Sequence, residues 1–394
     1  MRSEIDETRL GRIAAWMDRQ VDTGRLAGLA VQIAHRGDIC FSERRGQRDI
    51  GANLPVTDDT LWRLYSMTKP VTCLAALMLY EEGAFRLEQP VADFLPGFGQ
   101  AGVWAGGDAP PEQAVPLARP VTMHDLFTHQ SGLGYPNAEG RPIDRLWASA
   151  APFRTAPGWT MADAVAEMAR LPLWYQPGQH WYYGYSHDVL GRVIEVITGQ
   201  TLGAVMQDRI FAPLGMTETA FSFTPAQAPR MAACYGHGAE GLHQVAPADD
   251  PAYRAPVTLE KGGAGLVSTM GDYQRFASMM AAGGVHEGQR LIGRKTHEMM
   301  VMNQIGGDFA SRGPAHVGDR PGTGYGLGVG VLVDPAAAQS PASPGRYGWS
   351  GYASTDFWVD PVEEITVLLM TQMVPSGTFP LWRELEVAVS QALA

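Results

Sequence analysis

Lysine and cysteine are both scarce in this chain of 394 residues. Its only lysines are Lys69, Lys261 and Lys295, so a lysine that stands within a sequence pattern is unusually informative. The three cysteines are widely spaced and form no C-x-x-C, which argues against a disulfide framework. An excess of positive charge is also missing, because the formal net charge is −11. Without a basic surface to neutralise phosphates, we expect no nucleic-acid or membrane partner.

Long hydrophobic runs and several familiar motifs are missing too. No stretch reaches the roughly 18 apolar residues of a membrane span, and the N-terminal segment mixes charged and apolar residues at helical spacing, unlike a signal peptide. We therefore expect a cytoplasmic protein. There is no G-x-S-x-G, and "HEMMV" at His297 lacks the second histidine of a metalloprotease helix. We expect no metal and no cofactor.

What the sequence does contain is enough apolar material for a large core, at 45% hydrophobic residues. The spacing predicts a helix over 5–22, two strands within 28–47, a mostly helical middle, strands again between about 325 and 372, and a last helix from about 380. The two ends therefore share one sheet. We expect an α/β sheet domain made of 1–65 and 250–394, a helical lobe over 66–249, and a ligand crevice between them.

The segment "RLYSMTKPVTCLAALMLYEEG" places Ser66 and Lys69 one helical turn apart, so the lysine can reach the hydroxyl. A serine is a weak nucleophile unless an adjacent base takes its proton, and a lysine with a lowered pKa can be that base. Pro70 fits the first turn of a helix, where the positive end of the dipole favours an oxyanion. With 16 serines in the chain, S-x-x-K can also arise by chance.

An aromatic segment, "QPGQHWYYGYSHDVLGRVIEVITG", offers the lysine a partner. A base made from lysine needs a neighbour that shares its proton, and a phenol suits that role. Tyr185 lies just before the helix predicted to run from about Asp188 to Gly199. The alternative is that all the tyrosines of this region are packing aromatics, namely Tyr175, Tyr182, Tyr183 and Tyr185.

A glycine-containing turn in "RYGWSGYASTDFWVDP" offers an oxyanion hole. Such a turn lets the backbone approach a ligand closely, so the N–H of Tyr352 could act together with that of Ser66. A plain β-hairpin capped by a tryptophan is the alternative. The loop over 303–324 is expected, from its position, to border the site.

Together these segments carry a resemblance to a known family. "SMTKPVT", "EEGAFRLEQPVADFLPGF", "VTMHDLFTHQSGLGY", "YYGYSHDVLGRVIEVITG", "PLGMTET" and "GGAGLVSTMGDYQRFASMM" occur in the order of the serine β-lactamase (class C) and penicillin-binding-protein-like superfamily. The chain is most similar to its family VIII carboxylesterases, from about residue 25 to 373. The resemblance implies a β-lactamase-like fold, with a central antiparallel sheet flanked by helices, an inserted helical lobe and an active site in the crevice.

The resemblance also implies roles for single residues. Ser66 would be the acylated nucleophile, Lys69 its base, and Tyr185 the tyrosine that exchanges protons with them. Trp349 stands where class C β-lactamases carry the lysine of K-T-G, and it is expected to bind substrate with Gly351 and Tyr352. An indole cannot supply that lysine's charge, so a neutral, apolar acyl or alcohol group is expected there.

His187 departs from the family pattern, because it takes the asparagine position of Y-x-N as counted from Tyr185. It is expected among the substrate-binding residues, but its role stays open. One possibility is a hydrogen bond to the cluster of Ser66, Lys69 and Tyr185. The other, which we favour, is that it caps the helix.

The sequence thus predicts a serine carboxylesterase that hydrolyses small to medium carboxylic esters through an acyl-enzyme at Ser66, with weak or no β-lactam hydrolysis. Three alternatives stay open: a β-lactamase or D-amino-acid peptidase, an acyltransferase to an alcohol, and a ligand-trapping sensor that acylates once and stalls. A small-molecule ester is the only partner expected. The sequence does not determine the oligomeric state.

Overall fold

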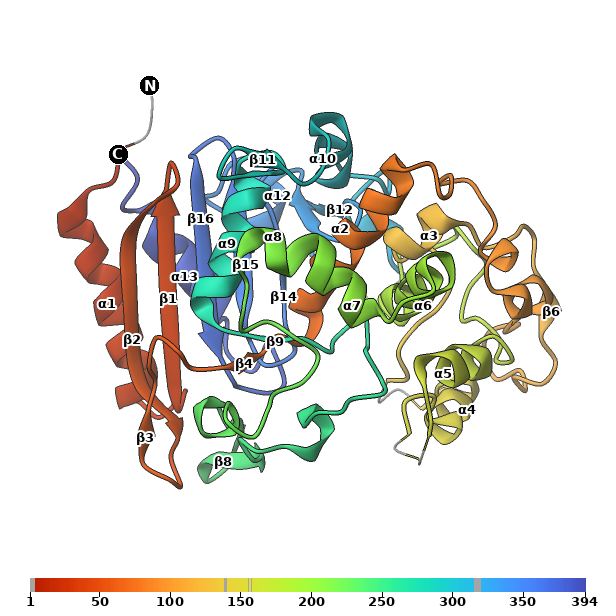
Figure 1. The fold of residues 1–394 in the computed structure, drawn as a ribbon, viewed down its shortest axis with the longest axis horizontal. Helices are drawn as coiled ribbons and strands as arrows, with labels where there is room; N and C mark the ends of the chain where they lie inside the picture. The colour runs from red at the N-terminus through yellow and green to blue at the C-terminus, as the bar shows by residue number, and fades with distance from the viewer. Residues whose placement is uncertain (1–3, 138–139, 155, 157, 315–319) are drawn as a thin grey trace.

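An antiparallel sheet of eight strands crosses the molecule in the order β12-β13-β14-β15-β16-β1-β2-β3 (Figure 1). The computed structural model describes residues 1–394 except 1–3, 138–139, 155, 157 and 315–319. The strands are β1 (Gly28–His35), β2 (Asp38–Asp49), β3 (Leu54–Pro55), β12 (Thr323–Tyr325), β13 (Gly330–Leu332), β14 (Tyr347–Ser350), β15 (Asp356–Asp360) and β16 (Ile365–Thr371). Since β1 pairs with β16, the prediction that both ends of the chain share one antiparallel sheet is confirmed.

The paired strands β1 and β16 are mostly apolar and buried along almost their whole length. In β1, "GLAVQIAH", every residue except His35 is buried, and in β16, "ITVLLMT", all seven are buried. Strands that are apolar on both faces need a cover on each side. The chain supplies that cover from its two ends and from its middle (Figure 1).

One face of the sheet is covered by α1 (Glu7–Asp22) and α13 (Leu381–Ser390). Asp6 caps α1 by accepting hydrogen bonds from two backbone N–H groups of its first turn. Apolar residues at three- and four-residue spacing then turn one side of α1 inward. The indole of Trp16 donates to Glu384 at 2.9 Å, which ties the two terminal helices together.

The opposite face is covered by α9 (Met270–Ala281), which packs against β1, β15 and β16. The other helices are α2 (Thr68–Glu81), α3 (Met123–Phe127), α4 (Pro142–Ala150), α5 (Met161–Met168), α6 (Ser186–Thr198), α7 (Leu202–Met206), α8 (Ala212–Leu214), α10 (Arg294–Met300), α11 (Phe309–Arg312) and α12 (Pro335–Ala338). Within the described residues no single helix is long and apolar enough to cross a membrane; α6 and the run Leu202–Leu214, bent by 81°, meet the length and composition criteria only as a pair.

Short strand pairs connect these layers. They are β4 (Trp62–Arg63) with β9 (Val267–Ser268), β5 (Gly102–Val103) with β6 (Val115–Pro116), β7 (Cys234–Gly238) with β8 (Gly241–Ala246), and β10 (Val285–His286) with β11 (Gln289–Arg290). The proposed lobe over 66–249 therefore holds helices α2 to α8 and also the two strand pairs β5–β6 and β7–β8. The bounds of this lobe stay a prediction, because α2, which lies inside it, packs against residues from within the lobe and from outside it.

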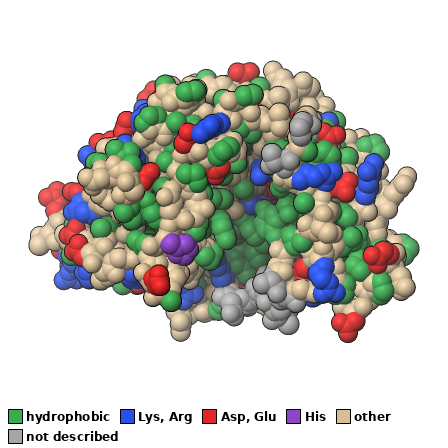
Figure 2. Space-filling model, turned by 90° about the horizontal axis from the view of Figure 1, so that it is seen from below, with side chains coloured by type: hydrophobic (Ala, Val, Ile, Leu, Met, Phe, Trp, Pro, Cys, Tyr) green, Lys and Arg blue, Asp and Glu red, His purple; other side chains and the backbone are tan. Residues whose placement is uncertain are grey.

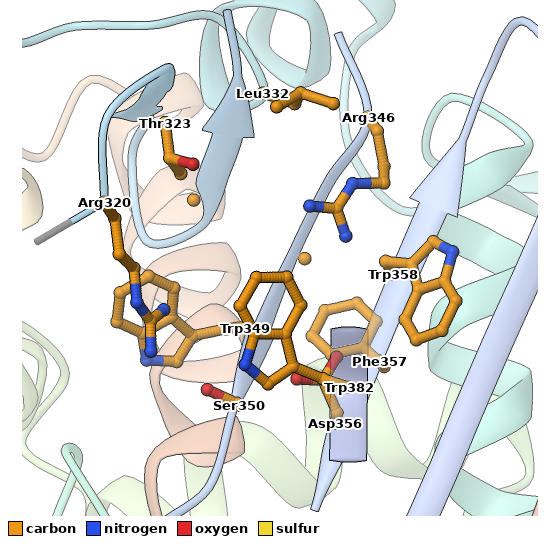
Figure 3. Close-up of a pocket in the computed structure, with 12 residues that line it drawn as sticks. Arg320, Thr323, Leu332, Arg346, Trp349, Ser350, Asp356, Phe357, Trp358 and Trp382 are labelled. Carbon is orange, nitrogen blue, oxygen red and sulfur yellow. The ribbon is translucent and has the colours of Figure 1, made fainter. Parts of the chain in front are cut away.

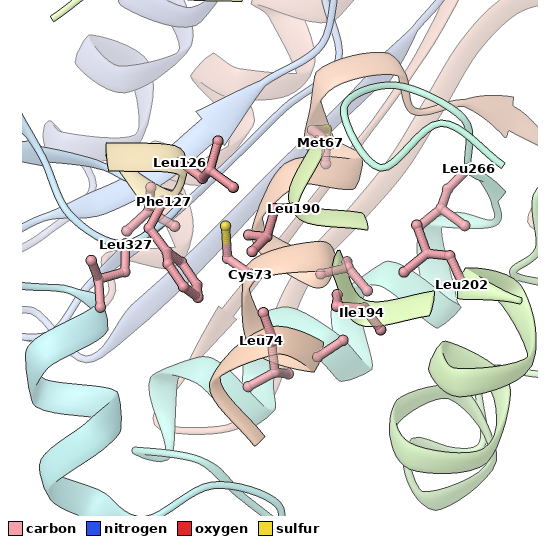
Figure 4. Packing of buried hydrophobic residues seen from close by; sticks show 14 of the residues in the cluster. Met67, Cys73, Leu74, Leu126, Phe127, Leu190, Ile194, Leu202, Leu266 and Leu327 are labelled. Atoms are coloured by element: carbon pink, nitrogen blue, oxygen red, sulfur yellow. The ribbon is translucent and has the colours of Figure 1, made fainter. Parts of the chain in front are cut away.

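Helix α2 is the centre of the larger core. Every residue from Thr68 to Leu79 is buried, as expected for a helix that is surrounded on all sides. Figure 4 shows Cys73 and Leu74 among side chains of α6, such as Leu190 and Ile194, with Leu266 beyond them. The start of α2, directly after Ser66, is therefore held by packing along the whole helix.

Removing two methyl groups from α2 should therefore cost much more than the same change at the surface. We expect Val71→Ala to lower the free energy of unfolding by about 2 kcal/mol, because Val71 has no exposed surface. Val387→Ala in α13 is the matched control, since Val387 is 57% exposed and its loss should cost less than about 0.5 kcal/mol. Urea denaturation measures both. Equal shifts of the midpoint would contradict the central position of α2.

Candidate active site

Ser66 lies in a single 3₁₀ turn, Tyr65–Met67, that leads directly into α2. The residue before it, Tyr65, has a φ of +45°, in the left-handed region that non-glycine residues rarely adopt. Such strain persists only where the surroundings enforce it, and it is typical of functional sites. Here it turns the chain between β4 and α2 so that Ser66 faces a cavity.

The Lys69 ammonium is buried and donates to three oxygens. They are Ser66 Oγ at 3.1 Å, the carbonyl of Gly263 at 2.7 Å and the hydroxyl of Tyr135 at 3.3 Å. An ammonium has three protons to donate, so these three acceptors satisfy it completely. The structure thus brings together the serine and lysine that the sequence pairs.

The Gly263 carbonyl reaches Lys69 because its loop packs tightly on the start of α6. A Cβ on Gly262 would lie 2.5 Å from the carbonyl oxygen of His187, and a Cβ on Gly263 would lie 2.6 Å from a carboxylate oxygen of Asp188. That same carboxylate accepts from the N–H of Gly263 at 3.0 Å. Asp188 therefore holds the N–H of the same glycine whose carbonyl accepts from Lys69, a connection that sequence patterns did not reveal.

Two tyrosines lie beside Lys69, and neither is Tyr185. Besides the hydrogen bond from Lys69 to Tyr135, the ring of Tyr183 lies 4.6 Å from Lys69 Nζ. Tyr183 also lines the same cavity as Ser66, and its hydroxyl accepts from the indole N–H of Trp349 at 3.2 Å. Burial raises the pKa of Tyr135 well above its usual range, so this phenol holds its proton.

Tyr185 points into a different environment. It is the residue before the first turn of α6, and its ring packs against Tyr135, stacks on Trp147 at 5.5 Å and meets Phe153 edge-on. Among the described residues its hydroxyl has no hydrogen bond to Ser66 or Lys69. The structure therefore places Tyr185 behind Tyr135, in the packing role that the sequence left open as the alternative.

His187 is not the helix cap that we favoured. It lies inside the first turn of α6 with no exposed surface, and its Nε2 contacts the Phe127 carbonyl at 3.0 Å and Cys73 Sγ at 3.4 Å. Burial and the nearby Lys69 charge lower the pKa of His187 to about 3, so its ring is neutral. A residue without exposed surface does not meet a ligand in the cavity, so the geometry gives no support to the expected substrate contact.

The backbone N–H groups of Ser66 and Tyr352 are both free of hydrogen bonds among the described residues. They lie close because Gly351 packs on the chain before the nucleophile: a Cβ there would collide with the Leu64 carbonyl and the Thr355 hydroxyl. Gly351 also donates to the Thr355 carbonyl at 2.8 Å, which fixes the turn. This arrangement agrees with the expected oxyanion hole.

Ser66 opens into a cavity of about 320 Å³, within the range typical of ligand sites. Half of its lining residues are aromatic. The lining residues are Ser66, Trp181, Tyr183, Phe309, Arg320, Trp349, Ser350, Gly351, Tyr352 and Ser376. On the face of the molecule shown in Figure 2, hydrophobic side chains likewise gather in a hollow.

The loop over 303–324 is expected from the sequence to border the site, and two of its residues, Phe309 and Arg320, line the cavity. Residues 315–319 of this loop lie outside the described part of the chain.

A smaller space of about 60 Å³ lies beside this cavity and shares Arg320, Trp349 and Ser350 with it (Figure 3). Its other walls include Arg346, Asp356 and Trp382. Within the described residues, no group of three or more His, Cys, Asp or Glu side chains could hold a metal ion.

Removing the carboxylate that holds the Gly263 peptide should weaken Lys69 as the partner of Ser66. We expect Asp188→Ala to slow modification of Ser66 by a fluorophosphonate roughly tenfold to a hundredfold, because a small displacement of a reacting group is costly. Asp188→Asn is the matched control: its amide oxygen can accept the same hydrogen bond, so most of the rate should remain. Melting temperatures of both variants separate this effect from loss of fold. A wild-type rate in Asp188→Ala would contradict the positioning role.

Comparison with known proteins gives a consistent result. The family model described as Beta-lactamase matches residues 13–389. Esterase EstB of Burkholderia gladioli is 31% identical over 384 residues, which cover 93% of this chain and 91% of EstB. Acyltransferase calJ of Penicillium decumbens is 28% identical over 389 residues, or 93% and 89% of the two chains. Among solved structures, "EstCE1, a hydrolase with promiscuous acyltransferase activity" has a TM-score of 0.83 at 25% identity and covers 98% of this chain and 99% of its own.

The family match extends over nearly the whole chain, so it includes the sheet, the helices that cover it and the segment around Ser66 and Lys69. The similarity to EstB has the same extent. These matches confirm the resemblance inferred from the motifs and the fold that it implied. The chain belongs to the beta-lactamase family, and it is a serine hydrolase.

Proposed function

We propose that the protein is a serine esterase that works through an acyl-enzyme on Ser66. The hydrogen bond of 3.1 Å between Lys69 Nζ and Ser66 Oγ, at the mouth of an aromatic cavity, is the observation that carries the proposal. Ser66 Oγ attacks the ester carbonyl, the alcohol leaves, and the acyl group stays on Ser66. Water then attacks the acyl-enzyme and releases the carboxylic acid. The names of EstB and EstCE1 support an esterase.

The proton follows the hydrogen bonds around Lys69. For Ser66 to attack, Lys69 must be in its neutral form and accept the proton of the hydroxyl. The departing alcohol needs a proton in return, and a phenol next to Lys69 can deliver it. Tyr183 is our candidate because it lines the cavity with Ser66, while Tyr135 hydrogen-bonds to Lys69 and orients it. This proposal replaces Tyr185 in the catalytic unit.

The oxyanion that forms during attack would be held by the N–H groups of Ser66 and Tyr352. Preorganised donors of this kind act where charge develops, so they stabilise the transition state more than the ground state. Trp349, Gly351 and Tyr352 form the wall of the cavity next to these donors, which supports them as substrate contacts. The aromatic rings of Trp349 and Tyr352 favour an ester with apolar parts.

Transfer of the acyl group to an alcohol instead of water is a second candidate. It is favoured by the similarity to acyltransferase calJ and by the acyltransferase activity named for EstCE1. The two reactions share the acyl-enzyme and differ only in what attacks it. A tenfold rise in product formation on adding an acceptor alcohol would favour transfer.

The first test compares an ester with a lactam. We expect p-nitrophenyl butyrate to be hydrolysed much faster than a chromogenic cephalosporin, because Trp349 stands where the family's lactamases carry a lysine. Ser66→Ala should lower ester turnover by several orders of magnitude, since it removes the nucleophile. The measurement is kcat/KM for both substrates with both proteins. Ester turnover that survives in Ser66→Ala would refute the proposed mechanism.

The second test separates the tyrosines by one identical substitution. We expect Tyr183→Phe to lower kcat by roughly 10²–10⁴, the usual contribution of general acid catalysis, and Tyr135→Phe to lower it by about tenfold. Tyr185→Phe is the matched control two residues away and should stay within about fivefold of wild type. If instead Tyr185→Phe shows the large loss, the phenol acts from behind Tyr135 and our assignment of Tyr183 is wrong.

A further inference from the structure

The cavity at Ser66 has a single charged side chain among its described lining residues, Arg320. All the others are aromatic, hydroxyl-bearing or glycine. Arg320 precedes β12, far in sequence from both Ser66 and Trp349, yet it lines the same wall as Trp349 and Ser350 (Figure 3).

The guanidinium of Arg320 has no hydrogen bond or ion pair within the part of the chain that the structure describes. Its Cζ atom lies 5.7 Å from the centre of the Trp382 ring. Arg320 is exposed although protein surrounds it closely enough for desolvation to lower its pKa, a combination that fits a side chain facing a cavity. A guanidinium stays charged in proteins, so five donors are available there.

Within the part of the chain that the structure describes, the neighbouring charges do not pair with Arg320. Arg346, in the space behind Trp349, is ion-paired with Glu386 at 3.1 Å. The carboxyl that lines this space among the described residues is Asp356, and burial raises the pKa of Asp356 to about 8, which weakens it as a counter-charge at neutral pH. Arg383 adds a further positive charge nearby.

We propose that Arg320 selects esters that carry a carboxylate, in either the acyl or the alcohol part; this inference rests on the proposed esterase function. The carboxylate would form a bidentate pair with the guanidinium, and the apolar chain between carboxylate and ester would lie along the aromatic wall. Trp349 leaves the K-T-G position without charge. Arg320 supplies a cation to the same cavity from another segment.

The experiment compares matched esters that differ only in the terminal group. The acyl series pairs mono-4-nitrophenyl adipate, suberate and sebacate with 4-nitrophenyl hexanoate, octanoate and decanoate. The alcohol series pairs 3-(butyryloxy)benzoate with its methyl ester. The readout is the ratio of kcat/KM, acid over neutral. Without a cation, the cost of bringing a carboxylate into an aromatic cavity should keep that ratio below one.

We expect a ratio of at least about ten for one member of either series, and a fall of about tenfold to a hundredfold in Arg320→Gln, the range of a charged hydrogen bond. Arg320→Lys should regain part of the ratio. Arg383→Gln is the matched control: it removes an equal charge near Arg320 but outside the cavity lining, so its ratio should stay within about twofold of wild type. Arg320→Met serves as the second removal variant if Arg320→Gln does not fold.

Three results would overturn the inference: a wild-type ratio near or below one in both series, an unchanged ratio in Arg320→Gln and Arg320→Met, or equal losses in Arg320→Gln and Arg383→Gln. Equal losses in the two variants would mean that the preference for acidic esters comes from the overall positive potential near the cavity and not from direct contact with Arg320. Failure of the esterase proposal looks different, since then neutral and acidic esters alike would react no faster with wild type than with Ser66→Ala.

Discussion

The buried ammonium of Lys69 is the constraint on which the rest of the site depends. Burying a charge without partners costs many kcal/mol, so each of its three protons must find an oxygen. Ser66 comes from the 3₁₀ turn directly before the helix of Lys69, whereas Gly263 and Tyr135 come from distant loops. Satisfying this one group therefore brings three separate segments to a single point. The nucleophile is positioned as one of those partners.

That constraint explains features that look unrelated in the sequence. The two glycines at 262 and 263 let a loop lie against the first turn of α6, and Asp188 at that turn holds the loop by its N–H. An acidic side chain in the first turn of a helix is favourable for the helix itself. Asp188 thus stabilises α6 and the Gly263 loop together, which couples the helical segment to the site chemistry.

Sequence patterns predicted what is local or periodic and missed what depends on packing. The sheet shared by both ends follows from apolar runs, and the Ser66–Lys69 pair follows from one turn of helix. The choice among tyrosines does not: Tyr183 and Tyr185 both precede α6, and only the packing of Trp147 and Phe153 shows which ring turns away from Lys69. Tyr135 is 66 residues from Lys69, and no spacing rule connects them.

The position of Trp349 shows why one motif cannot define the substrate. By its resemblance to class C β-lactamases, the sequence has an indole where those enzymes have the lysine of K-T-G. It therefore predicts that this part of the site has lost a positive charge. In the structure the indole N–H is already engaged by the Tyr183 hydroxyl, so Trp349 orients a tyrosine next to Lys69 as well as shaping the wall. The charge at that wall comes instead from Arg320. Shape and charge, which the lysine of K-T-G combines in one side chain, are divided here between two residues from different segments, so each can change without the other.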